Sequence, residues 1–118
     1  MNIRLFFMAL TLLVSTLRGQ VYDIQKYGAI ADGQTLNTKC IQTAIDACSA
    51  GGGGTVYVPA GVFKTGTLYL RSNVNLHLER GGVLKASPEI EDYAPFERPG
   101  FGATHYGLLF TLQAENVS

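Results

Sequence analysis

Short runs of alternating apolar and polar residues fill the stretch that follows residue 54. Their apolar positions are Val56 and Val58, Leu68 and Leu70, and Val74, Leu76 and Leu78. The polar positions between or beside them are Thr55 and Tyr57, Thr67 and Tyr69, and Asn75, His77 and Glu79. A period of two places successive side chains on opposite faces of a strand. The pattern therefore predicts three short strands, each with one buried face.

The runs recur at a nearly fixed spacing. The apolar pair in 56–58 returns twenty positions later in 76–78, and Gly61-Val62-Phe63 returns as Gly82-Val83-Leu84 after twenty-one. A longer echo, at 43 positions, links Ser72-Asn73-Val74 to Glu115-Asn116-Val117, which we interpret as two further periods. A repeat of about 20 residues is typical of a solenoid, in which each coil stacks on the one before it.

We therefore predict a right-handed parallel β-helix, in which equivalent strands of successive coils pair in parallel about 4.8 Å apart. An antiparallel β-sandwich also strings short strands together, at a spacing of about 8 to 12 residues. No two-residue Asn-Gly or Asp-Gly hairpin turn separates these strands, which argues against the sandwich.

A helical pattern precedes the first strand. Apolar residues at the i, i+3, i+4 and i+7 positions predict an amphipathic helix over 38–50; they are Ile41, Ala44, Ile45 and Cys48. Thr35 or Asn37 is the expected N-cap, and Gly51 the expected stop. The glycines after it would let the chain turn into the strand at 55–58. An open end of a solenoid exposes core and unpaired edge groups, so we expect this helix to cap the first coil.

The first 19 residues have the composition of a secretory signal peptide. Arg4 precedes the apolar run from Leu5 to Val14, and small or polar residues follow up to Gly19. The apolar run is about half the roughly 20 residues that span a bilayer, so a retained membrane anchor is disfavoured. We expect cleavage after Gly19, a secreted mature protein (extracellular or periplasmic), and a β-helix domain over 20–118.

The net charge of the mature chain bears on which ligands it can attract. Cleavage would remove Arg4 and Arg18, leaving seven basic against nine acidic residues and a charge of about −2. Such a chain has no overall electrostatic reason to bind nucleic acid, and an acidic substrate would need local attraction.

Cys40 and Cys48 lie eight positions apart on the predicted helix, about 12 Å, which is too far for a disulfide. We expect two buried thiols rather than a metal site.

Two segments resemble a known family. "YDIQKYGAIADGQTLNTKCIQTAIDAC" and "GGGGTVYVPAGVFKTGTLYLRSNVNLHLERGGVLKAS", within residues 22–93, are similar to the N-terminal part of the glycoside hydrolase family 28 of polygalacturonases and rhamnogalacturonases. This family belongs to the pectate-lyase-like superfamily. Its most telling features here are Tyr27-Gly28-Ala29, Asp32-Gly33 and the Pro59-Ala60-Gly61 corner. The N-terminal pattern is shared in part by lyases, epimerases and phage tailspikes.

The resemblance implies inverting hydrolysis of a galacturonan-type or rhamnogalacturonan-type pectic polysaccharide. An inverting enzyme needs carboxylates about 6.5 to 9.5 Å apart to admit the attacking water. The family motifs that supply them, Asn-Thr-Asp, Asp-Asp, Gly-His-Gly and Arg-Ile-Lys, do not occur in the 118 residues. We therefore assign no catalytic residue. We interpret the acidic pair Glu91-Asp92 as solvated loop.

Two residues are candidates for substrate binding. His105 and Tyr106 follow the long segment 87–104, and long loops on a rigid scaffold often line binding clefts. We interpret His77 as an ordinary surface residue. In an alternative hypothesis the outward row of Tyr57, Tyr69 and His77 and the loop 88–106 hold a glycan that the protein does not cleave.

The sequence stops inside a strand pattern at Val117-Ser118, where the earlier "SNVNLHL" continues. We expect an N-terminal fragment with the cap and about three coils, truncated at its C-terminus, and by itself inactive. The full-length protein is expected to be a monomer without a cofactor or metal. The alternatives are a noncatalytic carbohydrate-binding or structural module and a polysaccharide lyase on the same scaffold. A lyase would usually need calcium, and no calcium-binding pattern of acidic residues occurs.

Overall fold

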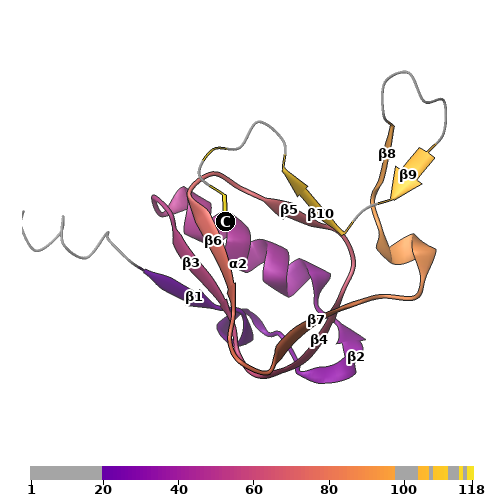
Figure 1. The fold of residues 1–118 in the computed structure, drawn as a ribbon, viewed down its shortest axis with the longest axis horizontal. Coiled ribbons are helices and arrows are strands. Elements are labelled where there is room, and N and C mark those ends of the chain that lie inside the picture. Colours follow the sequence, from indigo (N-terminus) through magenta and orange to yellow (C-terminus); the bar gives the residue numbers. More distant parts are fainter. Residues whose placement is uncertain (1–19, 98–103, 107, 112–114, 116) are drawn as a thin grey trace, which may run out of the picture.

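The computed structural model describes residues 20–97, 104–106, 108–111, 115 and 117–118 (Figure 1). Its helices are the 3₁₀ turn η1 (Ile24–Tyr27), the α-helix α2 (Thr38–Ala50) and the 3₁₀ turn η2 (Ile90–Asp92). Its strands are β1 (Val21–Asp23), β2 (Asp32–Leu36), β3 (Gly54–Val58), β4 (Gly61–Thr65), β5 (Leu68–Leu70), β6 (Val74–Leu78), β7 (Gly82–Ala86), β8 (Pro95–Glu97), β9 (Thr104–Tyr106) and β10 (Leu109–Thr111). The predicted signal peptide, 1–19, lies outside the described residues.

Three parallel sheets form the walls of a coil. Their strand orders are β1-β3-β6, β2-β4-β7 and β5-β10, so each turn of the chain after the first adds one strand to each wall (Figure 1). Connections of this kind between parallel strands are right-handed in nearly all proteins. The predicted right-handed parallel β-helix is confirmed.

The strand register confirms the sequence repeat. Val56 pairs with Leu76 across β3 and β6, and Gly61 pairs with Gly82 across β4 and β7, as the spacings of 20 and 21 predict. The echo at 43 positions was interpreted wrongly. The backbone N–H of Ser118 donates to the Val74 carbonyl at 3.1 Å, and Leu76 N–H donates to the Ser118 carbonyl at 2.7 Å. The two segments therefore lie on adjacent coils, and a 43-residue separation is one enlarged coil.

Helix α2 has the predicted bounds and caps the first coil. Along the chain it stands where a first strand of the β5-β10 wall would be (Figure 1). The side-chain amide of Gln42 completes that wall: its Nε2 donates to the Tyr69 carbonyl at 2.9 Å, and its Oε1 accepts from the Tyr69 N–H at 2.8 Å. Ser49 Oγ donates to the Ser72 carbonyl at 3.0 Å. The helix thus satisfies backbone groups that an open sheet edge would expose.

Asn37 is the N-cap residue, but its side chain makes no capping hydrogen bond. It is 1% exposed, and it instead bridges the loop before the helix. Its Oδ1 accepts from the Ile30 N–H at 2.9 Å, and its Nδ2 donates to the carbonyls of Ile30 and Thr35, both at 3.0 Å. The alternative cap, Thr35, is wrong, since Thr35 lies within β2 and bonds Asp32.

The glycines after α2 form the hinge into β3. Gly51 ends the helix with a φ of −83°, whereas the next three glycines have positive φ. Two of them also lie against backbone. A Cβ on Gly53 would be 2.7 Å from the Asn73 carbonyl oxygen, and one on Gly54 would be 2.4 Å from that of Gln20. These positions need glycine for both their conformation and the close packing of neighbouring coils.

The core fills the space between the walls and α2. Its largest fully buried side chains are Phe63, Ile24, Ile41, Ile45 and Leu68. Two expectations for the strand faces are wrong. Thr67 was expected on the solvent face but is 5% exposed, because residues 87–94 cross over it. Leu78 was expected in the core but is 41% exposed, since among the described residues only Glu115 and Ser118 bond to the far side of β6 and its approach.

Both cysteines carry free thiols, as the spacing predicts. Cys48 is fully buried, and burial raises the pKa of its thiol. Cys40 is only half-buried, so the expectation of two buried thiols holds for Cys48 alone. Within the described part of the chain, no helix combines the length and the apolar character needed to span a membrane.

Candidate functional site

The segment predicted as a long loop before His105 contains regular structure. Strands β8 and β9 pair in an antiparallel hairpin, in which Phe96 faces His105 and Pro95 faces Tyr106. The hairpin stands away from the coil next to the start of β10 (Figure 1). His105 and Tyr106 thus lie on a projecting hairpin beside the β5-β10 wall. Their role in substrate binding stays a prediction.

The beginning of this segment is tied to the coil. The Tyr93 hydroxyl donates to the Ser87 carbonyl at 2.6 Å, and the Ala94 N–H donates to Thr67 Oγ1 at 2.9 Å. Ser87 Oγ also donates to the Asp92 carboxylate. Asp92 is therefore a half-buried, hydrogen-bonded residue of η2. The interpretation of Glu91-Asp92 as solvated loop is wrong for Asp92, while Glu91 is exposed but also belongs to η2.

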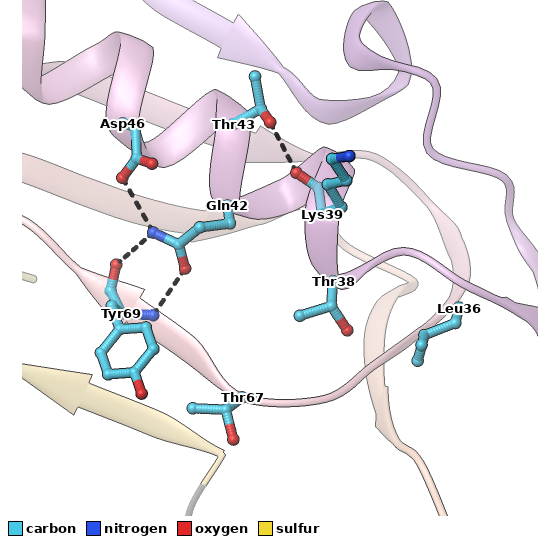
Figure 2. A pocket seen from close by; sticks show the side chains of 8 residues that line it. All are labelled: Leu36, Thr38, Lys39, Gln42, Thr43, Asp46, Thr67 and Tyr69. Carbon is cyan, nitrogen blue, oxygen red and sulfur yellow. Dashed lines mark hydrogen bonds between the residues drawn. The ribbon is translucent and has the colours of Figure 1, made fainter. Parts of the chain in front are cut away.

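A groove of about 520 Å³ lies between α2 and β5, at the capped end of the β5-β10 wall (Figure 2). It is lined by Leu36, Thr38, Lys39, Gln42, Thr43, Asp46, Thr67 and Tyr69. Seven of these eight side chains carry hydroxyl, amide or charged groups, but most of the lining surface is carbon. The polar groups of Gln42, Asp46 and Thr67 bond neighbouring residues of the chain. The sequence analysis missed this groove, although Lys39, Gln42, Thr43 and Asp46 are the polar residues opposite the apolar stripe of the helix.

Charged and aromatic groups at one end of the groove hold one another in place. The Arg71 Nε lies 3.1 Å from Asp46 Oδ1, and its guanidinium lies 5.8 Å from the centre of the Tyr69 ring. Gln42 Nε2 also donates to Asp46 Oδ1 at 3.0 Å (Figure 2). These contacts join α2 to β5 at this end of the groove. Asp46 is the one carboxylate among the described residues that line the groove.

The outward aromatic residues do not form the single row of the glycan-binding hypothesis. Tyr57 and His77 pair across β3 and β6, and their rings stack at a centroid distance of 6.1 Å. The Tyr57 hydroxyl donates to Glu79 Oε2 at 3.2 Å. Tyr69 belongs to the other wall, β5-β10, so only two of the three residues share a surface.

The acidic groups with shifted pKa values are not suited to acid catalysis. A hydrogen bond from the Thr35 hydroxyl, aided by the N–H groups of Thr35 and Gln34, lowers the pKa of Asp32 to about 2. The Arg80 N–H and then the Tyr57 hydroxyl lower the pKa of Glu79. A general acid at neutral pH needs a raised carboxyl pKa. Among the described residues, no three His, Cys, Asp or Glu side chains group as metal ligands.

The walls and the helical cap together define a right-handed parallel β-helix, with a groove at its capped end. Residues 21–94 match the family model described as rhamnogalacturonase A/epimerase, pectate lyase-like, and the chain belongs to this family.

Several proteins and solved structures of known name are similar to this chain. The exo-poly-alpha-D-galacturonosidase of Dickeya chrysanthemi is 51% identical over 74 residues, which are 63% of this chain and 12% of that protein. The family 28 exopolygalacturonase of Yersinia enterocolitica has a similar structure, with a TM-score of 0.75 and 37% identity over 82% of this chain and 17% of that one. Mannuronan C5-epimerase AlgE1 of Azotobacter vinelandii is 43% identical over 63 residues, 47% of this chain and 4% of that protein. The chain thus spans a small part of the length of each relative.

Proposed function

We propose that the protein containing this chain is a pectin-degrading glycoside hydrolase of the polygalacturonase type, which cleaves galacturonan-type polysaccharide with inversion. The observation that carries this proposal is the 51% identity to the Dickeya chrysanthemi exo-poly-alpha-D-galacturonosidase, which extends over most of the cap and coils. The match to the epimerase is shorter and less identical.

In this proposal the chain supplies the cap and the first coils, and the reacting carboxylates come from outside the sequence. Hydrolysis with inversion needs an acid and a base on opposite faces of the sugar, and the motifs that supply them in the family do not occur here. Residues 20–118 then contribute the scaffold and binding contacts, but no reacting carboxylate. They begin the β5-β10 wall and close its end, and the hairpin projects beside it. We further propose that residues 1–19 direct secretion and that the full-length protein is a monomer.

The assay that tests the proposed function uses the natural protein and the 118-residue chain side by side on polygalacturonate. The natural protein is expected to release reducing ends without forming an unsaturated uronate. The 118-residue chain is expected to release none. Formation of the unsaturated product would identify a lyase, and uronate inversion in a mannuronan without cleavage would identify an epimerase. Reducing ends released by the 118-residue chain would contradict the proposed division of roles.

Replacement of His105 and Tyr106 by alanine in the natural protein is expected to raise KM for polygalacturonate by roughly tenfold and to leave kcat within a factor of two. Loss of a sugar-binding contact weakens the substrate and the transition state alike, so only KM changes. Alanine at exposed Glu89, on the same segment, is the control and should change neither constant. Unchanged KM in the double variant would remove both residues from the binding surface.

A further inference from the structure

The outer face of the β2-β4-β7 wall carries two ladders of unlike chemistry. Lys64 pairs in register with Lys85, and two positions before them Val62 pairs with Val83. Both valines are exposed, at 37% and 45%. The side chains of Phe63 and Leu84 point inward between them, so all four residues face away from the core. We name this surface, Val62, Lys64, Val83 and Lys85, the lysine–valine strip.

The pairing of two lysines is unfavourable in the isolated chain. Like charges directly opposite on neighbouring strands destabilise a sheet. Among the described residues, neither lysine forms an ion pair with a carboxylate. The Lys85 ammonium donates to the Gly33 carbonyl at 3.3 Å, which places it over the first coil.

Asp32, the acidic residue of strands β2, β4 and β7, forms no ion pair with either lysine. Asp32 pairs in register with Val62, one coil below the Val83 position. Its oxygens accept hydrogen bonds from the Thr35 N–H at 2.7 Å, the Thr35 hydroxyl at 2.6 Å and the Gln34 N–H at 2.9 Å. The carboxylate is thus directed into its own turn. The positive charge of the strip is left for an external anion.

The chemistry of the strip suits a chain of uronic acid residues. The apolar C–H faces of a sugar ring can pack on exposed valines, while carboxylates pair with the ammonium groups. Successive coils are about 4.8 Å apart, so a polysaccharide lying along the axis of the β-helix meets a lysine on each of these two coils. A compact anion such as phosphate would use the lysines but not the valines.

We propose that the lysine–valine strip, on a wall separate from β5-β10, binds the anionic polysaccharide. The strip holds the polymer on the protein surface and takes no part in cleavage. The choice of a uronate polymer as occupant rests on the proposed function. The strip also supplies a local attraction for an acidic substrate, which the formal net charge of zero does not provide.

The test uses the natural protein with the double substitution Lys64→Gln and Lys85→Gln. The matched control is Lys26→Gln with Arg80→Gln, which changes the net charge equally at two exposed positions outside the strip. Binding to immobilised polygalacturonate is measured in the cold over a range of salt concentrations, and hydrolysis of trigalacturonate is measured separately. The strip variant should bind the polymer roughly three- to tenfold more weakly at low salt and should show a shallower salt dependence. Its kcat/KM on the trimer should equal that of the unmodified protein.

Equal weakening in the control pair would show that net charge alone is responsible and would overturn the proposal. Unchanged binding in the strip variant would overturn it too. Fully methyl-esterified pectin, which lacks the carboxylates, should bind both proteins alike, and a threefold or greater loss on it would contradict the role of charge. If the unmodified protein hydrolyses no galacturonan but binds it through the strip, the proposed function fails and the binding site stands.

Discussion

Replacing Gly66 by alanine should lower the free energy of unfolding by about 3 kcal/mol, at the upper end of the usual cost of overpacking. A Cβ on this buried residue would lie 1.8 Å from the Asp92 carbonyl oxygen and 3.3 Å from Thr38 Oγ1. The obstacle is backbone, held by the hydrogen bonds of Ser87 and Tyr93, so it cannot swing away like a side chain. Denaturant titration followed by circular dichroism measures the effect.

The control for Gly66 is Gly52→Ala. Gly52 has a φ of +97°, but a Cβ there would meet no atom within 4 Å. Its substitution should cost about 1 kcal/mol from backbone strain alone. If Gly66→Ala destabilises the protein no more than Gly52→Ala does, the close crossing of residues 87–94 over the coil is wrong.

Asn37→Ala is the second substitution with a large expected effect, a loss of about 3 kcal/mol, because three hydrogen bonds are worth about 1 kcal/mol each. The substitution would leave the N–H of Ile30 and the carbonyls of Ile30 and Thr35 without their partner. The loop that leads into α2 would loosen, and with it the cap. Hydrogen exchange should show faster exchange at the Ile30 amide before global unfolding.

Asn75→Ala serves as the comparison for Asn37. Asn75 is exposed, and its side chain accepts a hydrogen bond from the Ser118 hydroxyl at 3.1 Å. Its loss should change the free energy of unfolding by about 0.5 kcal/mol or less. A comparable loss at both asparagines would mean that the buried bridge of Asn37 adds nothing to stability.

The sequence predicted the coils well because their register is encoded in side-chain size and polarity. The recurrence of Val56 as Leu76 and of Gly61 as Gly82 follows directly from stacking, since each residue must fit the one below it. The bounds of α2 followed from its apolar stripe and from Gly51. These are local signals, repeated at the spacing that the fold imposes.

Contacts between segments far apart in the sequence could not be predicted. Thr67 fits the alternating pattern of a solvent face, yet it is covered by residues 27 positions away. Asn37 looks like an ordinary N-cap, but its side chain bonds Ile30, before β2, and Thr35, within β2. The enlarged coil resembled two periods because 43 is close to twice 20. The pairing of Leu68 with Leu109 and the hydrogen bonds between Ser118 and β6 distinguish the two cases.

The candidate site was less accessible to sequence reasoning than the fold. The groove depends on how Gln42 and Asp46 of the helix face Tyr69 of β5, and that arrangement has no motif of its own. The lysine–valine strip lies in the repeat itself, where Val62 and Lys64 return as Val83 and Lys85. The sequence repeat predicted which residues are buried. The outward-facing residues repeat at the same spacing, so the repeat also predicts which of them lie next to one another on the surface.

The enlarged coil shows where such proteins can accept insertions during evolution. Between β7 and β10 the chain leaves the coil, builds a hairpin and returns, and Leu109 still stacks on Leu68. Doubling the length of a connection costs only about 0.6 kcal/mol in chain entropy. Insertions at this corner therefore leave the scaffold intact, so evolution can exchange the hairpin while the coils stay the same. A hairpin grafted from a relative should, in the same way, be accepted without redesign of the core.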